Sequence, residues 1–291
     1  MDPHLLRTFV AVAETGSFSA AAQRLRYTQS AVSQQIAALE ADLGTPLLTR
    51  RPVALTTAGE RLQRHANLIL VRLEAARADV TRSIAPPGRL VLGLTPLAWS
   101  APVPAALARL RAESARLHTR ILVADRDRIV AAAATGEIDL GLVDGFAAPS
   151  DPLRLPEPGA HDAVGVAGSP AVVAVPEGHP LARRASVDLG DLADAYWIDA
   201  PVLAPFARLP VDGLRAGLHY DGADVTVLTG LVAAGHGLIV LPAPVVANRP
   251  GLAGVPIAAP RLVHRVELLR APGSEEPAAR LAGLLGAQAL Q

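Results

Sequence analysis

The most regular pattern of apolar and polar positions lies in the first 43 residues. Apolar residues recur there three and four positions apart, which predicts amphipathic helices over residues 4–15, 17–25 and 28–43. Ser17 and Thr28 stand at the starts of two of these segments and are good N-cap residues. A few polar residues separate the second helix from the third, so the two form a helical hairpin.

The third predicted helix has one apolar face and one polar face. Its apolar face is formed by Val32, Ile36, Leu39 and Leu43. The opposite side carries hydrogen-bonding side chains near the amino end: Thr28, Gln29, Ser30, Ser33 and Gln34. Glutamine can make a bidentate contact with adenine, and serine can bond several base edges. The pattern predicts a helix-turn-helix whose second helix enters a major groove. The alternative is an ordinary hairpin with a solvated polar face.

A short alternating segment follows at residues 45–58. Leu48 and Val53 flank the basic pair Arg50 and Arg51, which predicts a two-stranded wing with arginines near its tip. Arginine there can grip phosphates or enter a minor groove, and the alternative is a solvated turn. The third helix has no basic residue, so we expect glutamine and serine to read bases while arginines supply the affinity.

A heptad-like seam runs through residues 59–84. Its apolar positions are spaced 4, 3, 4, 3 and 4 apart: Leu62, Ala66, Ile69, Leu73, Ala76 and Val80. Such a seam is typical of helices that pair between subunits, and the alternative is a helix packed on its own domain. Pro86-Pro87-Gly88 then predicts a hinge.

Residues 89–291 alternate strand-like and helix-like segments. Residues 89–145 read as strand, helix, strand, helix, strand, which is the order of a parallel α/β sheet. A second such unit begins near residue 163. Within it, residues 225–242 read as strand, helix, strand.

Composition adds further limits. Hydrophobic residues make up 51% of the chain and aromatic residues only 3%, with no formal net charge. The chain has no cysteine, which excludes disulfides, thiolate metal sites and cysteine nucleophiles. The start of the sequence is unlike a signal peptide, and no apolar run is long enough to span a membrane, so we expect a cytoplasmic protein.

The segments FVAVAETGSFSAAAQRL, TQSAVSQQIAALEADLG, PLLTR and LTTAGERL closely resemble the winged helix-turn-helix of LysR-type transcriptional regulators. The body segments VVAVPEGHPLA and LVAAGHGLIVLP resemble that family's regulatory domain. The resemblance implies an α/β protein: an N-terminal winged helix-turn-helix, a long linker helix, and a two-lobed effector domain of the periplasmic-binding-protein type. The implied bounds are 1–58 for the DNA-binding domain, 59–84 for the dimerisation helix and 89–291 for the effector domain. Lobe I would comprise 89–162 and 264–291, and lobe II 163–263.

The implied function is sequence-specific transcription regulation controlled by a small-molecule effector bound between the lobes. The implied partners are double-stranded DNA with a roughly palindromic site, a second copy of the chain in a dimer or tetramer, and RNA polymerase if the protein is an activator. No cofactor is expected.

Ligands of open α/β sheets bind beyond the carboxyl ends of the strands. The candidate effector residues at these ends are Thr95, Trp99, Ser100, Asp125, Asp144, Asp199 and Thr229. Thr95 and Ser100 favour an anion, whereas the three aspartates favour a cation or are simply helix and turn caps. Trp99 lines the cleft or belongs to the core.

An enzyme is not expected. The sequence has no G-x-S-x-G, H-E-x-x-H or phosphate-loop motif, and its eight histidines lack metal-ligand spacing.

Overall fold

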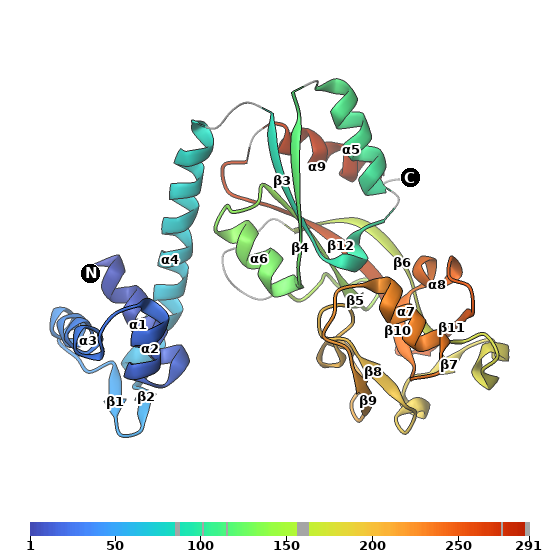
Figure 1. Cartoon of the computed structure of the whole chain (residues 1–291), viewed down its shortest axis with the longest axis horizontal. Coiled ribbons are helices and arrows are strands. Elements are labelled where there is room, and N and C mark those ends of the chain that lie inside the picture. Colours follow the sequence, from blue (N-terminus) through green and yellow to red (C-terminus); the bar gives the residue numbers. More distant parts are fainter. Residues whose placement is uncertain (85–87, 101, 115, 156–162, 275, 289–291) are drawn as a thin grey trace. The chain divides into compact units, whose positions relative to one another are not determined.

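The computed structural model describes residues 1–291 except 85–87, 101, 115, 156–162, 275 and 289–291. The chain divides into two compact units, Met1–Ala78 and Asp79–Gln291. The predicted hinge at Pro86-Pro87 lies outside the described residues. The predicted fold class is confirmed: a helical head with a small wing, a long helix and an α/β body (Figure 1).

The head contains three short helices, a two-stranded wing and the start of the long helix. The bounds are α1 Pro3–Thr15, α2 Phe18–Leu25, α3 Gln29–Leu43, β1 Leu48–Arg50, β2 Val53–Leu55 and α4 Thr57–Ser83. Ser17 and Thr28 accept the backbone N–H groups of Ala20 and Ala31, as expected of N-caps. Gly44 ends α3 in the left-handed conformation.

The core of the head joins all of these elements. Its fully buried side chains include Leu6 and Phe9 of α1, Ile36 of α3 and Ala66 of α4. Burying one large aliphatic or aromatic side chain contributes about 1.5–3 kcal/mol. The apolar stripes that predicted the helices therefore also fix how they pack.

The body is built on an eight-stranded mixed sheet with the order β4-β3-β5-β12-β6-β11-β7, and β10 also pairs with β6. The strands are β3 Arg89–Leu94, β4 His118–Val123, β5 Leu140–Ala147, β6 Ala163–Pro176, β7 Val187–Asp188, β10 Ile239–Pro242, β11 Leu252–Ala259 and β12 Val263–Arg270. A separate parallel pair is formed by β8 Trp197–Asp199 and β9 Ala216–His219. The long β6 links two lobes: its first half pairs with β12 and its second half with β10 and β11.

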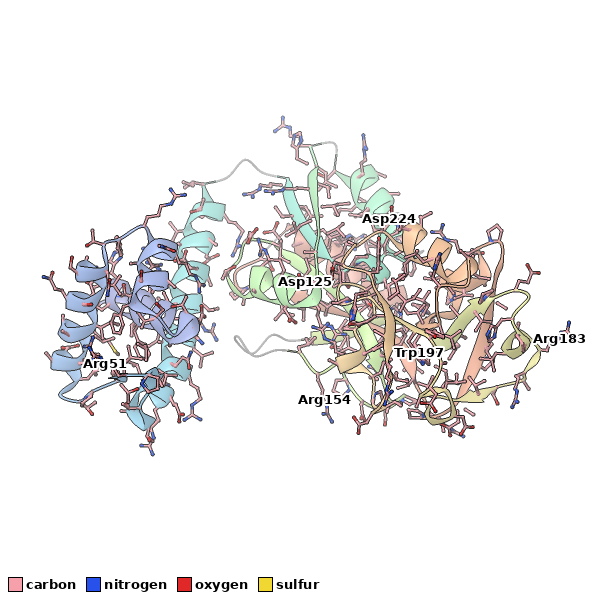
Figure 2. All side chains as sticks on the ribbon, turned by 60° about the horizontal axis from the view of Figure 1, so that its bottom comes forward. Arg51, Asp125, Arg154, Arg183, Trp197 and Asp224 are labelled. Atoms are coloured by element: carbon pink, nitrogen blue, oxygen red, sulfur yellow. The ribbon has the colours of Figure 1, made fainter. Side chains whose placement is uncertain are left out.

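Helices cover both faces of the sheet in the first lobe, where α5 (Pro102–Glu113) and α9 (Ala278–Gln288) lie on one face and α6 (Arg126–Ala134) on the other (Figure 1). In the second lobe, α7 (Val225–Ala233) and α8 (Ala243–Ala247) pack on one face. Fully buried Trp197 centres the core on the other face (Figure 2). Short 3-10 turns are η1 Pro96–Ala98, η2 Pro180–Arg183, η3 Gly190–Leu192 and η4 Phe206–Arg208.

One predicted element is wrong. The sequence predicts that residues 225–242 begin with a strand, but they begin with helix α7, Val225–Ala233. The Asp224 carboxylate accepts the N–H groups of Thr226 and Val227, and this cap starts a helix despite the β-branched residues that follow.

Candidate nucleic-acid interface and ligand site

Helix α3 has the two faces that the sequence predicts. Val32, Ile36 and Leu39 are fully buried, whereas Leu43, predicted for the same face, is 40% exposed because it lies in the last turn of the helix. Thr28, Gln29, Ser30 and Gln34 are exposed, and Ser33 is half-buried beside them. Because the apolar face holds the helix in the core, the polar side chains near its amino end are presented to solvent with a fixed register.

Hydrogen bonds tie α3 to other elements of the head. Buried Thr8 of α1 donates its hydroxyl to the Gln35 side chain at 2.5 Å. Glu40 accepts the backbone N–H groups of Leu47 and Leu48 at 2.8 and 3.2 Å, which ties the entry of the wing to the last turns of α3. Sequence reasoning singles out neither Thr8 nor Glu40. Their partners lie on other elements, and only the fold brings them together.

The two wing arginines differ in their surroundings. The Arg50 guanidinium lies 4.9 Å from the centre of the Phe18 ring and 3.4 Å from a Glu40 carboxylate oxygen. Arg51 lies in the turn between β1 and β2, and its side chain is exposed (Figure 2). Within the described residues, no hydrogen bond or ion pair engages the Arg51 guanidinium. Arg50 therefore holds the wing against α2 and α3, while the Arg51 guanidinium makes no hydrogen bond or ion pair with the described residues.

The predicted seam of α4 divides into two parts. Ala66 is fully buried in the head core, and Leu62 packs against the same core, so Ala66 cannot face a partner subunit. Here the helix is packed on its own domain, which is the alternative that the sequence leaves open. Farther along, Ile69 is 40% exposed and Val80 is 68% exposed. Ala76 is also exposed, and Leu73 is half-buried.

A buried polar network occupies the carboxyl ends of β3 and β5. Thr95 donates its hydroxyl to one oxygen of the Asp144 carboxylate, and His264 Nε2 lies 3.0 Å from the other. All three side chains are buried. Arg126 donates to the Asp144 carbonyl oxygen at 2.9 Å through Nε. Burial, with a smaller contribution from the nearby Arg208 guanidinium, lowers the pKa of Arg126 to about 10, so this residue is charged at neutral pH.

This network changes the set of candidate ligand contacts. The Thr95 hydroxyl and the Asp144 carboxylate are hydrogen-bonded to each other, and the carboxylate also contacts His264. These side chains therefore support the structure of the body and are not free to contact a ligand. Thr229 is also buried, and its hydroxyl donates to the Val225 carbonyl oxygen within α7. The expectation that Thr229 lies at a strand end is wrong, because α7 begins four residues earlier.

The other candidates lie closer to solvent. Asp125 is exposed and caps α6 by accepting the Arg128 N–H at 2.9 Å (Figure 2). Asp199 accepts the Phe206 N–H at 3.3 Å and lies 3.4 Å from His219 Nδ1. Ser100 is half-buried, and Trp99 is 46% exposed.

Trp99 lines a groove of about 460 Å³ between the two lobes. The other lining residues are Leu94, Pro96, Ile121, Val123, Ala223, Asp224 and Val225. The walls therefore come from the ends of β3 and β4 and from the start of α7. The surface is almost entirely apolar, and its one charged group, Asp224, is engaged in capping α7.

Comparison with known proteins identifies both units. Residues 3–60 match the sequence model of bacterial regulatory helix-turn-helix proteins of the lysR family. Residues 84–283 match the model of the LysR substrate binding domain. The chain belongs to the LysR family. It is a transcription regulator with a DNA-binding helix-turn-helix head and an effector-binding body.

Individual relatives and solved structures match most of the length of this LysR regulator. A probable hydrogen peroxide-inducible genes activator of Mycobacterium avium is 33% identical over 97% of this chain and 92% of the relative. The regulator AlsR of Bacillus subtilis is 29% identical over 83% of this chain and 80% of its own. Full-length CbnR complexed with its target DNA is 26% identical, with a TM-score of 0.53 over 99% of this chain and 100% of that chain. A Corynebacterium glutamicum OxyR C206 mutant is 25% identical, with a TM-score of 0.52 over 99% of this chain and 92% of that chain.

The described residues of this LysR regulator contain no candidate membrane-spanning helix and no candidate metal site. No helix there combines the length and apolar character that crossing a membrane requires. No group of three or more acidic or histidine side chains in the same residues is placed to hold a metal ion.

Proposed function

We propose that this LysR regulator reads its target DNA with the amino end of α3, through Gln29, Ser30, Ser33 and Gln34. The observation that carries the proposal is the division of α3 into a fully buried apolar face and an exposed glutamine and serine face. Bidentate glutamine contacts and serine hydroxyls are suited to base edges in a major groove. Thr28 caps the helix and stands beside these residues at its amino end.

Phosphate contacts come from arginines outside α3. Arg51 is proposed as the wing contact because it is exposed and unengaged within the described residues. Arg50 keeps about half of its side chain exposed while it braces the wing, so it adds positive charge at the same surface. Neutralising phosphates supplies most of the sequence-independent affinity of such proteins.

Self-association would use the outer part of α4. Ile69, Leu73, Ala76 and Val80 continue the apolar seam beyond the head core. A second apolar surface lies between α5 and the edge strand β4, where Leu107, Ala108 and Leu117 line a groove. Two separate apolar surfaces suit a dimer that can assemble further into a tetramer, and a two-fold pair of heads reads a roughly palindromic site.

The effector is proposed to bind in the groove lined by Trp99, with Ser100 close by in sequence. Nothing in the sequence can carry out thiol chemistry, because the chain has no cysteine. The M. avium relative is named as a probable hydrogen peroxide-inducible genes activator, and one of the similar solved structures is an OxyR C206 mutant. For this chain we propose regulation by reversible binding rather than by cysteine oxidation.

The buried network does not support catalysis. In a nucleophilic triad, histidine contacts the nucleophile hydroxyl and the carboxylate orients the histidine. Here Asp144 stands between Thr95 and His264, so the imidazole has no contact with the hydroxyl that it would have to activate. We propose that the protein has no enzymatic activity. Because its family binds DNA, we propose that it works in the cytoplasm.

The test is selection of binding sites from a random duplex library with the full chain. The expected result is enrichment of one sequence containing two half-sites related by a two-fold axis. Recovery of unenriched sequences would contradict base reading by α3. Thermal-shift screening against metabolites, with Trp99→Phe as a groove variant and Tyr196→Phe as an exposed control, tests the effector groove. A metabolite whose stabilising effect is the same in Trp99→Phe as in the wild type binds elsewhere.

A further inference from the structure

The turn between α2 and α3 contains an unusual backbone conformation. Arg26 has φ 58° and ψ 39°, which is the left-handed region. Among the described residues, every other position with positive φ is a glycine. The three short head helices end with similar backbone angles, and the other two end at Gly16 and Gly44, with φ 61° and 66°.

The cap itself does not need an arginine. The Arg26 backbone N–H bonds back to α2, as the N–H groups of Gly16 and Gly44 bond back to their own helices. Left-handed backbone is unfavourable for a residue with a Cβ atom. Asparagine and aspartate relieve this partly through short polar side chains, which arginine lacks. Glycine would make the same turn with less strain, so the reason for an arginine must lie in its side chain.

The Arg26 side chain makes no contact that would stabilise the described part of the fold. It is exposed, and within the part of the chain that the structure describes its guanidinium has no hydrogen bond, ion pair or ring contact. Arg24, two residues earlier, differs because it pairs with Glu14 at 2.5 Å. The strain at Arg26 is therefore not offset by any interaction of its side chain within the described protein.

The position of Arg26 suggests what offsets the strain. Arg26 lies two residues before Thr28, the N-cap of α3, so their Cα atoms are at most about 7.6 Å apart. Helix α3 contains no basic residue, and its only charged side chains are Glu40 and Asp42. A helix that enters a major groove lies between two rows of phosphates. A cation at its amino end must therefore come from the preceding turn.

We propose that Arg26 is a phosphate-binding residue at the turn of the helix-turn-helix, retained in a strained conformation at the expense of the head's stability. The inference rests on the proposed function, in which α3 enters a major groove. Arg26 would add one phosphate contact to those proposed above. Removing its side chain should therefore stabilise the free protein and weaken the complex of the protein with DNA.

The test compares Arg26→Gly with the wild type in the full chain, using thermal unfolding and fluorescence anisotropy on the selected duplex over a series of KCl concentrations. The melting temperature of the head should rise by several degrees, since about 1 kcal/mol shifts that of a 60–100-residue domain by about 4–8 °C. The slope of log affinity against log salt should become shallower by about 0.9 for each phosphate that is no longer neutralised, or about 1.8 for a pair of heads.

Two further variants separate charge from backbone. Arg26→Lys should keep most of the salt slope and show no increase in stability, because it retains both the charge and the Cβ atom. Arg24→Ala, which removes an arginine already paired with Glu14, should leave the salt slope within about 0.3 of the wild-type value, a third of the change that one phosphate produces.

Two results would overturn the proposal: an unchanged salt slope in Arg26→Gly, or a lower melting temperature in that variant. The first would make Arg26 a solvated residue, and the second would mean that its side chain supports the fold. The wild-type chain is tested first for selection of a duplex. If it selects none, the proposed function is overturned before any variant is compared.

Discussion

Glu40 joins the last turns of α3 to the wing, and replacing it tests that link. One carboxylate oxygen accepts two backbone N–H groups, from Leu47 and Leu48, and the other lies 3.4 Å from Arg50. The Glu40 side chain is only 17% exposed. In Glu40→Ala, two backbone donors at the start of the wing lose a charged acceptor.

The expected cost follows from these hydrogen bonds. A hydrogen bond to a charged group contributes about 1.5–3 kcal/mol, so two give about 3–6 kcal/mol as an upper range. Water can reach part of this site, so we expect Glu40→Ala to destabilise the head by about 3 kcal/mol, the lower end of that range. Glu40→Gln keeps an acceptor of the same shape. It should cost about 1–2 kcal/mol, because neutral bonds are weaker and the exposed Arg50 pair adds at most about 1 kcal/mol.

Urea unfolding of the full chain gives the free energies, and amide hydrogen exchange at Leu47 and Leu48 locates the effect. Glu14→Ala is the matched control, because it removes an exposed ion pair with Arg24 and should cost about 1 kcal/mol or less. If Glu40→Ala costs no more than this control, or if the Leu47 and Leu48 amides exchange no faster, Glu40 does not hold the start of the wing.

Three further predictions concern the seam, the buried network and a surface ion pair. Ile69→Asp with Val80→Asp should convert the protein to monomers in sedimentation velocity, because both substitutions would place charge at the proposed interface. Asp144→Ala should destabilise the body by about 3–5 kcal/mol in urea unfolding, since it leaves buried polar partners unpaired. The Arg280 guanidinium holds the pKa of Glu113 below its ordinary value. The stability that this carboxylate contributes between α5 and α9 is therefore present above the ordinary pKa and lost as the pH falls through the lowered one.

Each of these has a clear contrary result. A dimer that persists in the double aspartate variant would place the interface elsewhere. An Asp144→Ala variant as stable as the wild type would mean that the network is not a structural support. If the acid unfolding profile is the same in Glu113→Gln as in the wild type, the Glu113 and Arg280 pair does not contribute to acid stability.

Local patterns predict the head well because its signals lie within a few residues of each other. Thr28 and Gly44 bound α3 through contacts inside the same helix, and the apolar spacing gives the face that is buried. The turn at Arg26 escapes prediction because the sequence RLRYT contains no glycine or asparagine to mark a left-handed residue.

The ligand site is predicted less well because its geometry depends on distant residues. Thr95 and Asp144 are 49 positions apart, and His264 is 120 positions beyond Asp144. No spacing rule indicates that these three side chains meet and satisfy one another. The start of α7 fails for a different reason: the run VTVLT favours a strand by its β-branched residues, and the capping Asp224 outweighs that preference.

Base reading by the exposed face of α3 is tested most directly by binding-site selection with variants of that face. The full chain, Gln29→Ala with Gln34→Ala, and the control Gln23→Ala on the exposed surface of α2 would each select from the same random duplex library. We expect the α3 variant to lose about 1–3 kcal/mol of discrimination at particular base pairs of each half-site, while the control selects the wild-type sequence. Selection of the wild-type sequence by the α3 variant, with unchanged discrimination, would contradict base reading by these glutamines.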